Sequence, residues 1–440
     1  MIYDISEERV GYWNSAQFAY GIFPRVTARS NLTAKELRST AVKSTNTAWI
    51  WESSLPRVRR RVTLSSPCSK EKCFLPSGSR WLFQYGEPIG TDSSGSMVQI
   101  YDLVGDYTIK PVIELHPSLA IDKLAGESLA ADKVVFAAQF EPSTPTLIKV
   151  MVADFESSRG KFNVSVSEAY HLSMEQPIED IVLQEGILAV VTAKTVTLQR
   201  WDQPASRRET EGDWSWRPRG CRVARNRLIV CEEYLGIGEL RNCRIAIYDI
   251  SSVVGGIDYS DKEKHERALY PISVSGMTGY PLLPFSAPYQ ADRLSRELQF
   301  STLVFTHDSL NKGPHLWKCE FRVLIANHQD EDEDTSKESV NHLVVGTPNI
   351  LGYTDDGDPQ NSPRFPDSCI IGNSSARIIW ATSSGELRIY STWTEDYSWR
   401  SRPIDFGRPM SVPQLLAFDE QLGVVVLSER SGQFTVLWFV

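Results

Sequence analysis

The chain has no apolar segment of the kind that spans a membrane or directs secretion. Its longest apolar runs, Val424–Leu427 and Val436–Val440, fall far short of the roughly 18 residues that a membrane helix needs. The first ten residues, MIYDISEERV, are acidic and contain none of the apolar core of a signal peptide. We therefore expect a protein of the cytoplasm or nucleus that is not secreted and has no membrane partner.

The chain also lacks an excess of positive charge. It has 46 Lys and Arg residues against 55 Asp and Glu residues, a formal net charge of −9. Because nucleic acids and anionic membranes attract basic surfaces, this balance argues against both as partners. Only seven residues are Cys, an odd number, and Cys221, Cys231 and Cys243 lie in or beside apolar runs. This usage predicts free, buried thiols in a reducing compartment.

The usual catalytic and metal-binding motifs are missing. Neither G-x-S-x-G nor H-E-x-x-H occurs. The segment Gly236–Arg241 resembles the start of a dinucleotide fingerprint but has no third Gly, and Cys68 and Cys73 have no second Cys pair near them. Asp355–Asp358 lacks the alternating ligands of a calcium loop. We therefore predict no catalytic residues, no metal site and no cofactor, and hence a protein that is not an enzyme.

Aromatic residues are plentiful, with 12 Trp, 16 Tyr and 17 Phe, which suits packed β-sheets. A pair of short apolar strands, Arg80–Tyr85 and Met97–Leu103, recurs along the chain. The first strand returns as GILAVVTA, RLIVCE, RIIWAT and LGVVVLS, and the second as TVTLQRWD, CRIAIYDI, ELRIYS and FTVLWFV. A weaker copy spans 133–155. The recurrence predicts repeated antiparallel sheets.

The spacing of the repeat predicts a β-propeller. Equivalent positions near the end of the second strand lie 52, 48, 47, 142 and 48 residues apart, at Asp102, Asp154, Asp202, Asp249, Ser391 and Phe439. A step near 48 matches one four-stranded blade of a WD-repeat-like propeller. The long step represents two blades with insertions, giving seven blades, or three blades, giving eight. We favour seven, because Leu298–Thr306 and Trp317–Ala326 are the strand-like stretches within that step.

The domain organisation follows from this reading. Residues 1–55 are an N-terminal segment with one helix, whose capping box runs from Thr33 to Glu36. Residues 56–440 are the propeller, with insertions around 260–267, 328–340 and 353–366. The chain ends within a strand, so we expect the last blade to take a strand from the N-terminal part, around Val58–Leu64. The basic run Arg57–Arg61 predicts an exposed edge strand there, with a patch for an acidic partner as the alternative.

Several segments together resemble the region after the F-box in fungal, mainly basidiomycete, F-box-like proteins. They are NLTAKELRSTAVKS followed by TAWIW, then FLPSGSRWLF with GSMVQIYDL, then NSSARIIWATSSGELRIY, and the terminal GVVVLSERSGQFTVLWF. The resemblance spans roughly residues 31–440. It implies a propeller that recruits a target to a ubiquitin ligase through the Skp adaptor and a cullin. The F-box itself is not evident, because residues 1–30 are too few and too polar to form one.

These observations favour a non-catalytic platform for protein–protein interaction, with an unknown protein as partner. The candidate binding residues are Trp214, Trp216, Arg217 and Arg219, since Trp and Arg are enriched at interface hot spots. The alternative is that the two Trp side chains only fill a gap between blades. A carbohydrate-binding or hydrolytic propeller is the alternative function, and it predicts several carboxylates or aromatic residues at one mouth of the channel. The recurring Asp102, Asp202 and Asp249 end strands, where they can cap turns by hydrogen-bonding the backbone.

Overall fold

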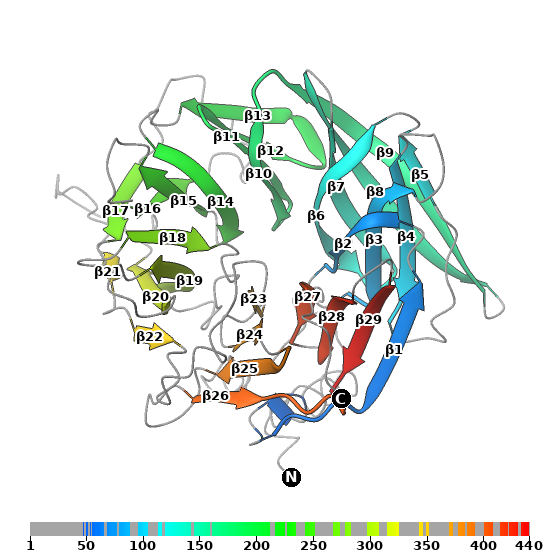
Figure 1. Ribbon diagram of the computed structural model, residues 1–440. Coiled ribbons are helices and arrows are strands. Elements are labelled where there is room, and N and C mark those ends of the chain that lie inside the picture. The colour runs from blue at the N-terminus through cyan, green and yellow to red at the C-terminus, as the bar shows by residue number, and fades with distance from the viewer. Residues whose placement is uncertain are drawn as a thin grey trace, which may run out of the picture.

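The computed structural model of the 440-residue chain is a ring of antiparallel β-sheets, and the predicted all-β propeller is confirmed (Figure 1). The structure describes residues 47, 50–51, 53, 55–65, 68–76, 79–88, 96–103, 113–116, 119–141, 145–158, 161–211, 216–224, 227–234, 243–250, 267–272, 278–282, 297–307, 315–324, 343–345, 349–351, 369–372, 377–382, 385–391, 400–407, 414–420, 422–429 and 433–439. The helix predicted after Thr33 and the insertions at 328–340 and 353–366 lie outside these residues, as does almost all of 260–267.

The described strands form seven hydrogen-bonded sheets, the number that the preferred ring of seven blades requires. The first four sheets in chain order comprise β2 (Cys68–Phe74), β3 (Trp81–Pro88), β4 (Ser96–Asp102) and β5 (Ile113–His116); β6 (Ala120–Ala130), β7 (Lys133–Glu141), β8 (Thr146–Ser158) and β9 (Lys161–Met174); β10 (Ile178–Gln184), β11 (Ile187–Thr192), β12 (Thr195–Arg200) and β13 (Gln203–Glu211); β14 (Trp216–Ala224), β15 (Arg227–Tyr234), β16 (Cys243–Asp249) and β17 (Arg267–Ile272).

The remaining sheets are β18 (Thr278–Leu282), β19 (Glu297–His307), β20 (His315–Leu324) and β21 (Leu343–Val345), with β22 (Asn349–Leu351) also on β20; β23 (Cys369–Ile371), β24 (Arg377–Ala381), β25 (Leu387–Ser391) and β26 (Arg400–Pro403); and β27 (Gln414–Asp419), β28 (Val424–Glu429), β29 (Gln433–Trp438) and β1 (Arg60–Ser65). β19 and β20 confirm the two strands predicted within the long step. That step therefore spans two sheets.

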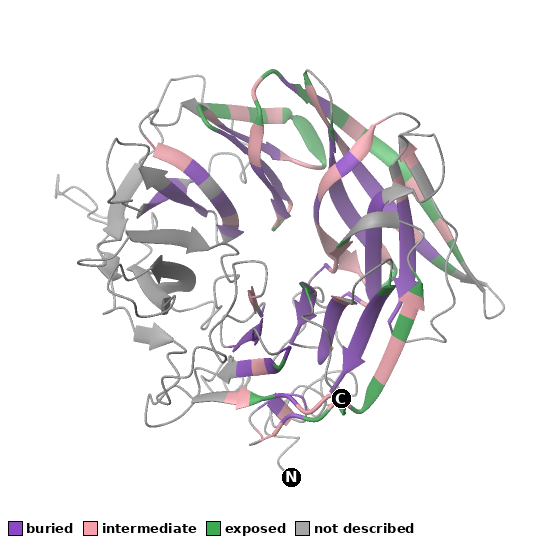
Figure 2. Ribbon diagram, viewed as in Figure 1, coloured by how far each residue is buried: buried purple, intermediate pink, exposed green. Residues whose placement is uncertain are grey.

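The recurring apolar pairs of the sequence are the two middle strands of their sheets. β11, for example, is buried along its whole length. Figure 2 shows the same arrangement: the middle strands carry most of the buried residues, and outer strands such as β13 and β1 are partly exposed. Middle strands pack against neighbouring sheets on both faces, which explains why they read as continuous apolar runs rather than as alternating ones.

The ring is closed by a strand from the N-terminal part of the chain, as predicted. β1 pairs antiparallel with β29, with Val62 opposite Val436 and Leu64 opposite Phe434. β1 is the edge strand of this sheet, and Arg60 is exposed while its guanidinium lies 5.6 Å from the ring of Trp438. The predicted edge strand is therefore confirmed.

The segment that precedes β1 is also packed into the ring. Thr47, Ile50 and Trp51 have helical backbone geometry, and Trp51 is fully buried. Its indole lies in the core between the β23–β26 sheet and the last sheet, with residues such as Ile404 and Phe418. The Arg402 guanidinium donates to the carbonyls of Trp51 and Ser53 at 2.9 and 2.8 Å. This segment therefore joins the two sheets that flank the point of closure.

One tight turn is fixed by a side chain from the neighbouring sheet. Glu185 and Gly186 both have positive φ, at 54° and 79°, between β10 and β11. This geometry suits Gly, whereas it is strained for Glu. The Glu127 carboxylate of β6 accepts hydrogen bonds from both backbone N–H groups at 2.8 Å. These two bonds stabilise the strained turn and connect adjacent sheets.

Candidate functional site

The innermost strands of the ring carry a repeated irregularity. β2, β6, β10, β14 and β27 each lie at the inner edge of their sheets (Figure 1). In each of them one extra residue interrupts the pairing with the next strand, which is a β-bulge. A bulge turns a side chain out of the regular alternation and often lies beside a functional site. The bulges fall at Lys70–Glu71, Asp122, Glu179, Arg219 and Leu416.

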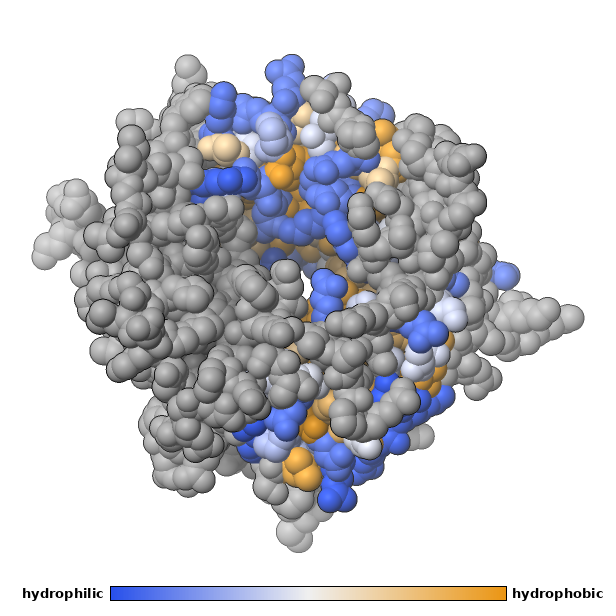
Figure 3. Space-filling model, in the orientation of Figure 1, coloured by the Kyte–Doolittle hydropathy of each residue, from blue (hydrophilic) through white to orange (hydrophobic). Residues whose placement is uncertain are grey.

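Charged residues at or beside these bulges form one ion pair at each of three successive junctions between sheets. Between β2 and β6, the Lys72 ammonium lies 2.8 Å from Asp122 Oδ1. Between β6 and β10, Lys123 pairs with Asp180. Between β10 and β14, the Arg217 guanidinium binds Glu179 with two hydrogen bonds of 3.0 and 2.9 Å. We call these six residues the inner-rim ion pairs. Figure 3 shows hydrophilic residues gathered beside the central hollow of this face.

The cation is the more exposed member of every inner-rim ion pair. The exposed side-chain fractions are 47% for Lys72 against 38% for Asp122, 39% for Lys123 against 6% for Asp180, and 42% for Arg217 against 16% for Glu179. The carboxylates also serve the framework, since Asp180 Oδ2 accepts from the backbone N–H of Cys221 at 2.8 Å. The rim therefore exposes more of each cationic side chain than of its carboxylate partner, with a small difference at Lys72–Asp122 and a large one at the other two pairs.

The surroundings of Lys123 perturb its acid–base equilibrium. Loss of water around the ammonium group lowers the pKa of Lys123 to about 8, and the neighbouring Arg222 guanidinium acts in the same direction. Burial also lowers the pKa of Arg222 and raises the pKa of the Cys221 thiol to about 11. Lys123 is therefore mostly charged at neutral pH and loses its charge in mildly alkaline solution.

The structure places two of the four predicted binding residues on β14. Trp216 and Arg217 begin this inner strand, and both are partly exposed. Trp214 lies outside the described residues, and so does the side chain of Arg219, which occupies the bulge of β14. Arg217 belongs to the inner-rim ion pairs through Glu179. Trp216 is thus brought beside the rim, by its position next to Arg217 in the strand.

Trp216 is supported from within its own sheet. The Arg244 guanidinium of β16 lies 4.1 Å from the centre of the Trp216 ring, a cation–π contact. Arg244 Nε lies 2.5 Å from Glu232 Oε2 of β15, and the side chains of both are almost fully buried. A buried ion pair thus holds a guanidinium against the indole. Sequence reasoning missed Glu232 and Arg244, since each sits inside a strand whose apolar residues dominate the pattern.

Sequence reasoning also missed the inner-rim residues other than Arg217. The available signal was a pair of adjacent charged residues in the strand before some of the recurring apolar pairs, such as Asp122-Lys123 and Glu179-Asp180. Adjacent charged residues of this kind ordinarily mark solvent-exposed positions of a strand. They did not indicate a binding site, because only the ring brings them together.

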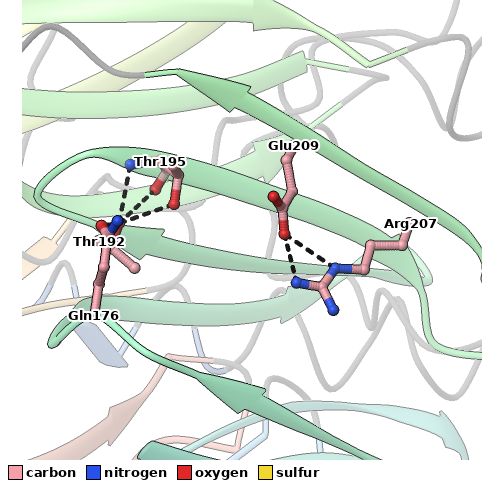
Figure 4. A network of polar contacts seen from close by, with 5 residues as sticks. All are labelled: Gln176, Thr192, Thr195, Arg207 and Glu209. Atoms are coloured by element: carbon pink, nitrogen blue, oxygen red, sulfur yellow. Dashed lines mark hydrogen bonds and ion pairs between the residues drawn. The ribbon is translucent and has the colours of Figure 1, made fainter. Parts of the chain in front are cut away.

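A second polar network orders the hairpin between β11 and β12 (Figure 4). The Thr192 hydroxyl accepts from the backbone N–H of Thr195 at 2.9 Å and of Lys194 at 3.2 Å, and it donates to Gln176 Oε1 at 2.9 Å. Thr382 caps the hairpin between β24 and β25 in a similar way, accepting from Glu386 N at 3.0 Å. Both Thr residues are buried, and each lies at the end of the first strand of a recurring apolar pair.

Replacing Thr192 by Val should destabilise the protein by roughly 1–2 kcal/mol, because the variant keeps the shape but removes a buried hydroxyl that accepts hydrogen bonds from two backbone N–H groups of the turn. Urea unfolding at neutral pH measures the effect. The matched control is Thr192→Ser, which retains the hydroxyl and should lose clearly less. Equal losses in the two variants would show that the methyl group rather than the hydrogen bonds matters here.

The recurring Asp residues stabilise strand ends. Arg80 Nε donates to Asp102 Oδ1 at 2.8 Å, and Arg200 donates to both oxygens of Asp202 at 3.0 and 2.9 Å. The hydrogen bonds from Arg200 lower the pKa of Asp202, whereas a catalytic acid needs a raised one. Among the described residues no cluster of His, Cys, Asp or Glu could hold a metal ion, and none of the helices there is long and apolar enough to cross a membrane.

Comparison with known proteins identifies the fold. Neither a protein-family model nor a curated protein sequence matches the chain. Among solved structures, the chain is similar to the β-propeller domain of Cps50 (Swd1) from Myceliophteria thermophila, with 11% identity and a TM-score of 0.50 over 87% of this chain and all of that one. The WD40 domain of SCAP from fission yeast shows 9% identity and a TM-score of 0.46 over 86% and 98%. At 11% identity the likeness to the Cps50 domain shows the β-propeller fold alone.

Proposed function

We propose that this propeller is a non-catalytic platform that binds a protein partner at its inner rim. The observation that carries this proposal is the exposure pattern of the inner-rim ion pairs, in which a rigid set of β-strands exposes more of the Lys72, Lys123 and Arg217 side chains than of their carboxylate partners. Such strands fix the position of the groups before a partner arrives, which lowers the cost of ordering them on binding. The protein acts in the cytoplasm or nucleus.

The predicted hot-spot residues fit this surface. Trp216 and Arg217 begin β14 at the rim, and the buried Glu232–Arg244 pair supports the indole from behind. Trp and Arg side chains contribute much of the binding energy at protein interfaces when they are held in place. Trp214 and Arg219 are proposed as further contact residues of the same surface.

At the finer level, we propose that the platform selects targets for a ubiquitin ligase, as the resemblance to F-box-like proteins implies. The test is affinity purification of the tagged full-length chain from a fungal cell after chemical cross-linking, with mass spectrometry and with the tag alone as control. Specific proteins cross-linked to peptides of β6, β10 or β14 are expected. Recovery of nothing above the control would overturn the platform. If specific proteins appear without the Skp adaptor and cullin, the platform stands and the ligase role falls.

A further inference from the structure

We propose that the inner rim recognises an acidic segment of its protein partner, an extended stretch rich in Asp and Glu. This inference rests on the proposed function and specifies the chemistry of the partner. The first observation is that three successive junctions between sheets contribute an ion pair, and the cation has the more exposed side chain each time.

The carboxylates of these pairs are not available to a ligand to the same extent. Asp180 is 6% exposed and accepts a hydrogen bond from the backbone of Cys221, and Glu179 is 16% exposed and bound at both oxygens by Arg217. Asp122 Oδ2 accepts from Gln139 Nε2 at 3.3 Å. Asp122 itself is 38% exposed, so the difference between cation and carboxylate is large at Lys123–Asp180 and Arg217–Glu179 and small at Lys72–Asp122.

The arrangement of the cations favours an extended anionic ligand. The three cations lie on three different inner strands: Lys72 on β2, Lys123 on β6 and Arg217 on β14. They are not neighbours in a single loop, so one small anion would not contact all of them. A peptide with several carboxylates can follow the rim from sheet to sheet. Each carboxylate then forms a charge-assisted hydrogen bond with a cation that is already held in position.

The charge of the whole protein favours a peptide over a nucleic acid. The chain has a net charge of −9, which repels a long polyanion wherever that polyanion lies within the Debye length, about 10 Å at moderate salt, of the acidic surface. A short acidic segment enters the local field of the rim and exposes less of its charge to the rest of the surface. Cationic groups that line one concave region of an acidic protein therefore select for a short, extended acidic stretch.

Fluorescence anisotropy with the full-length protein tests the proposal. The probes are a labelled peptide of alternating Glu and Ser, the same peptide with Lys in place of Glu, and a labelled DNA duplex, all at low ionic strength. We expect the Glu peptide to bind, with affinity that falls as salt is added. Failure of the Glu peptide to bind, or tighter binding of the Lys peptide or the duplex, would overturn the proposal.

Variants locate the binding. Lys72→Gln combined with Arg217→Gln should weaken binding of the Glu peptide by about fivefold for each cation removed. The matched control is Lys133→Gln, because Lys133 forms an ion pair with Asp154 at 3.2 Å in which both side chains are similarly exposed, at 43% and 42%, but it lies on β7 rather than on an inner strand. Melting curves of both variants confirm that they fold.

Equal binding by the double variant and the control would refute the rim as the acidic-peptide site. The two proposals can also be separated. If the double variant still cross-links to the cellular partner as the unchanged protein does, the platform remains and the acidic specificity is wrong. Loss of the partner in the double variant, with retention in Lys133→Gln, supports both.

Discussion

Removal of residues 1–65 is expected to abolish the cooperative unfolding transition or to lower the melting temperature by tens of degrees. The deletion takes away β1, which is the only described partner of β29 on its outer side, and with it the apolar side chains of Val62 and Leu64 that pack on the last sheet. It also takes away Trp51, which fills the core between two sheets. Circular dichroism during thermal unfolding measures the change.

A single substitution tests which part of that segment matters most. Trp51→Ala should cost roughly 3–5 kcal/mol, because a fully buried indole leaves a large cavity that a rigid sheet core cannot collapse to fill. The indole ring lies 4.5 Å from the ring of Phe439 and 5.5 Å from that of Phe418, and its Nε1–H donates to the carbonyl of Glu420 at 3.2 Å. Guanidinium unfolding at neutral pH gives the difference in free energy.

Trp51→Phe is the matched control. It keeps an aromatic ring in the same core but loses the hydrogen bond to Glu420 and part of the buried volume, so that a smaller loss of roughly 1–2 kcal/mol is expected. A Trp51→Ala variant as stable as the unchanged protein would show that the N-terminal segment merely lies on the ring. In that case the deletion of residues 1–65 should act through β1 alone.

The sequence predicted the closure of the ring for a physical reason. The apolar strand FTVLWFV needs a partner on each of its two edges, and the earlier run RRVTLS alternates polar and apolar residues as an edge strand does. The pairing of β1 with β29 follows from these two facts. The middle strands were equally predictable, since burial on both faces gives the continuous apolar runs of β11 and β28.

The candidate site was predictable only in part. Arg217 was selected because Trp and Arg stand together in the sequence, but its partner Glu179 lies 38 residues earlier and has no local signal. The inner strands β2, β6, β10 and β14 carry charged residues among their apolar ones, and each is interrupted by a bulge. Periodicity does not identify such strands. The residues of the inner rim meet only through the curvature of the ring, which no local pattern encodes.

The second large effect concerns the buried ion pair behind Trp216. Arg244→Met should destabilise the protein by roughly 3–5 kcal/mol, because it leaves the Glu232 carboxylate buried without the guanidinium that compensates its charge. The exposed side-chain fractions are 3% for Glu232 and 9% for Arg244, so that water reaches neither group easily. The variant also loses the contact of the guanidinium with the Trp216 ring at 4.1 Å. Urea unfolding at neutral pH is the measurement.

The double variant Glu232→Leu with Arg244→Met is the decisive control. It removes both charges and replaces them with apolar side chains of similar volume, and such replacements of a buried pair are often close to neutral. We therefore expect it to be more stable than Arg244→Met alone by roughly 2 kcal/mol or more. If the double variant were as unstable as the single one, the loss would come from packing against Trp216 rather than from an uncompensated charge.

The same pair of variants separates stability from binding. In the double variant the ring of Trp216 rests on an apolar side chain in place of a guanidinium, while the inner-rim ion pairs, including Arg217 with Glu179, keep all of their atoms. An acidic peptide should then bind it almost as tightly as the unchanged protein, because the exposed cations that we propose to attract it are intact. If the double variant were stable but did not bind the peptide, the position of the Trp216 indole, which Arg244 sets, would be part of the recognition surface.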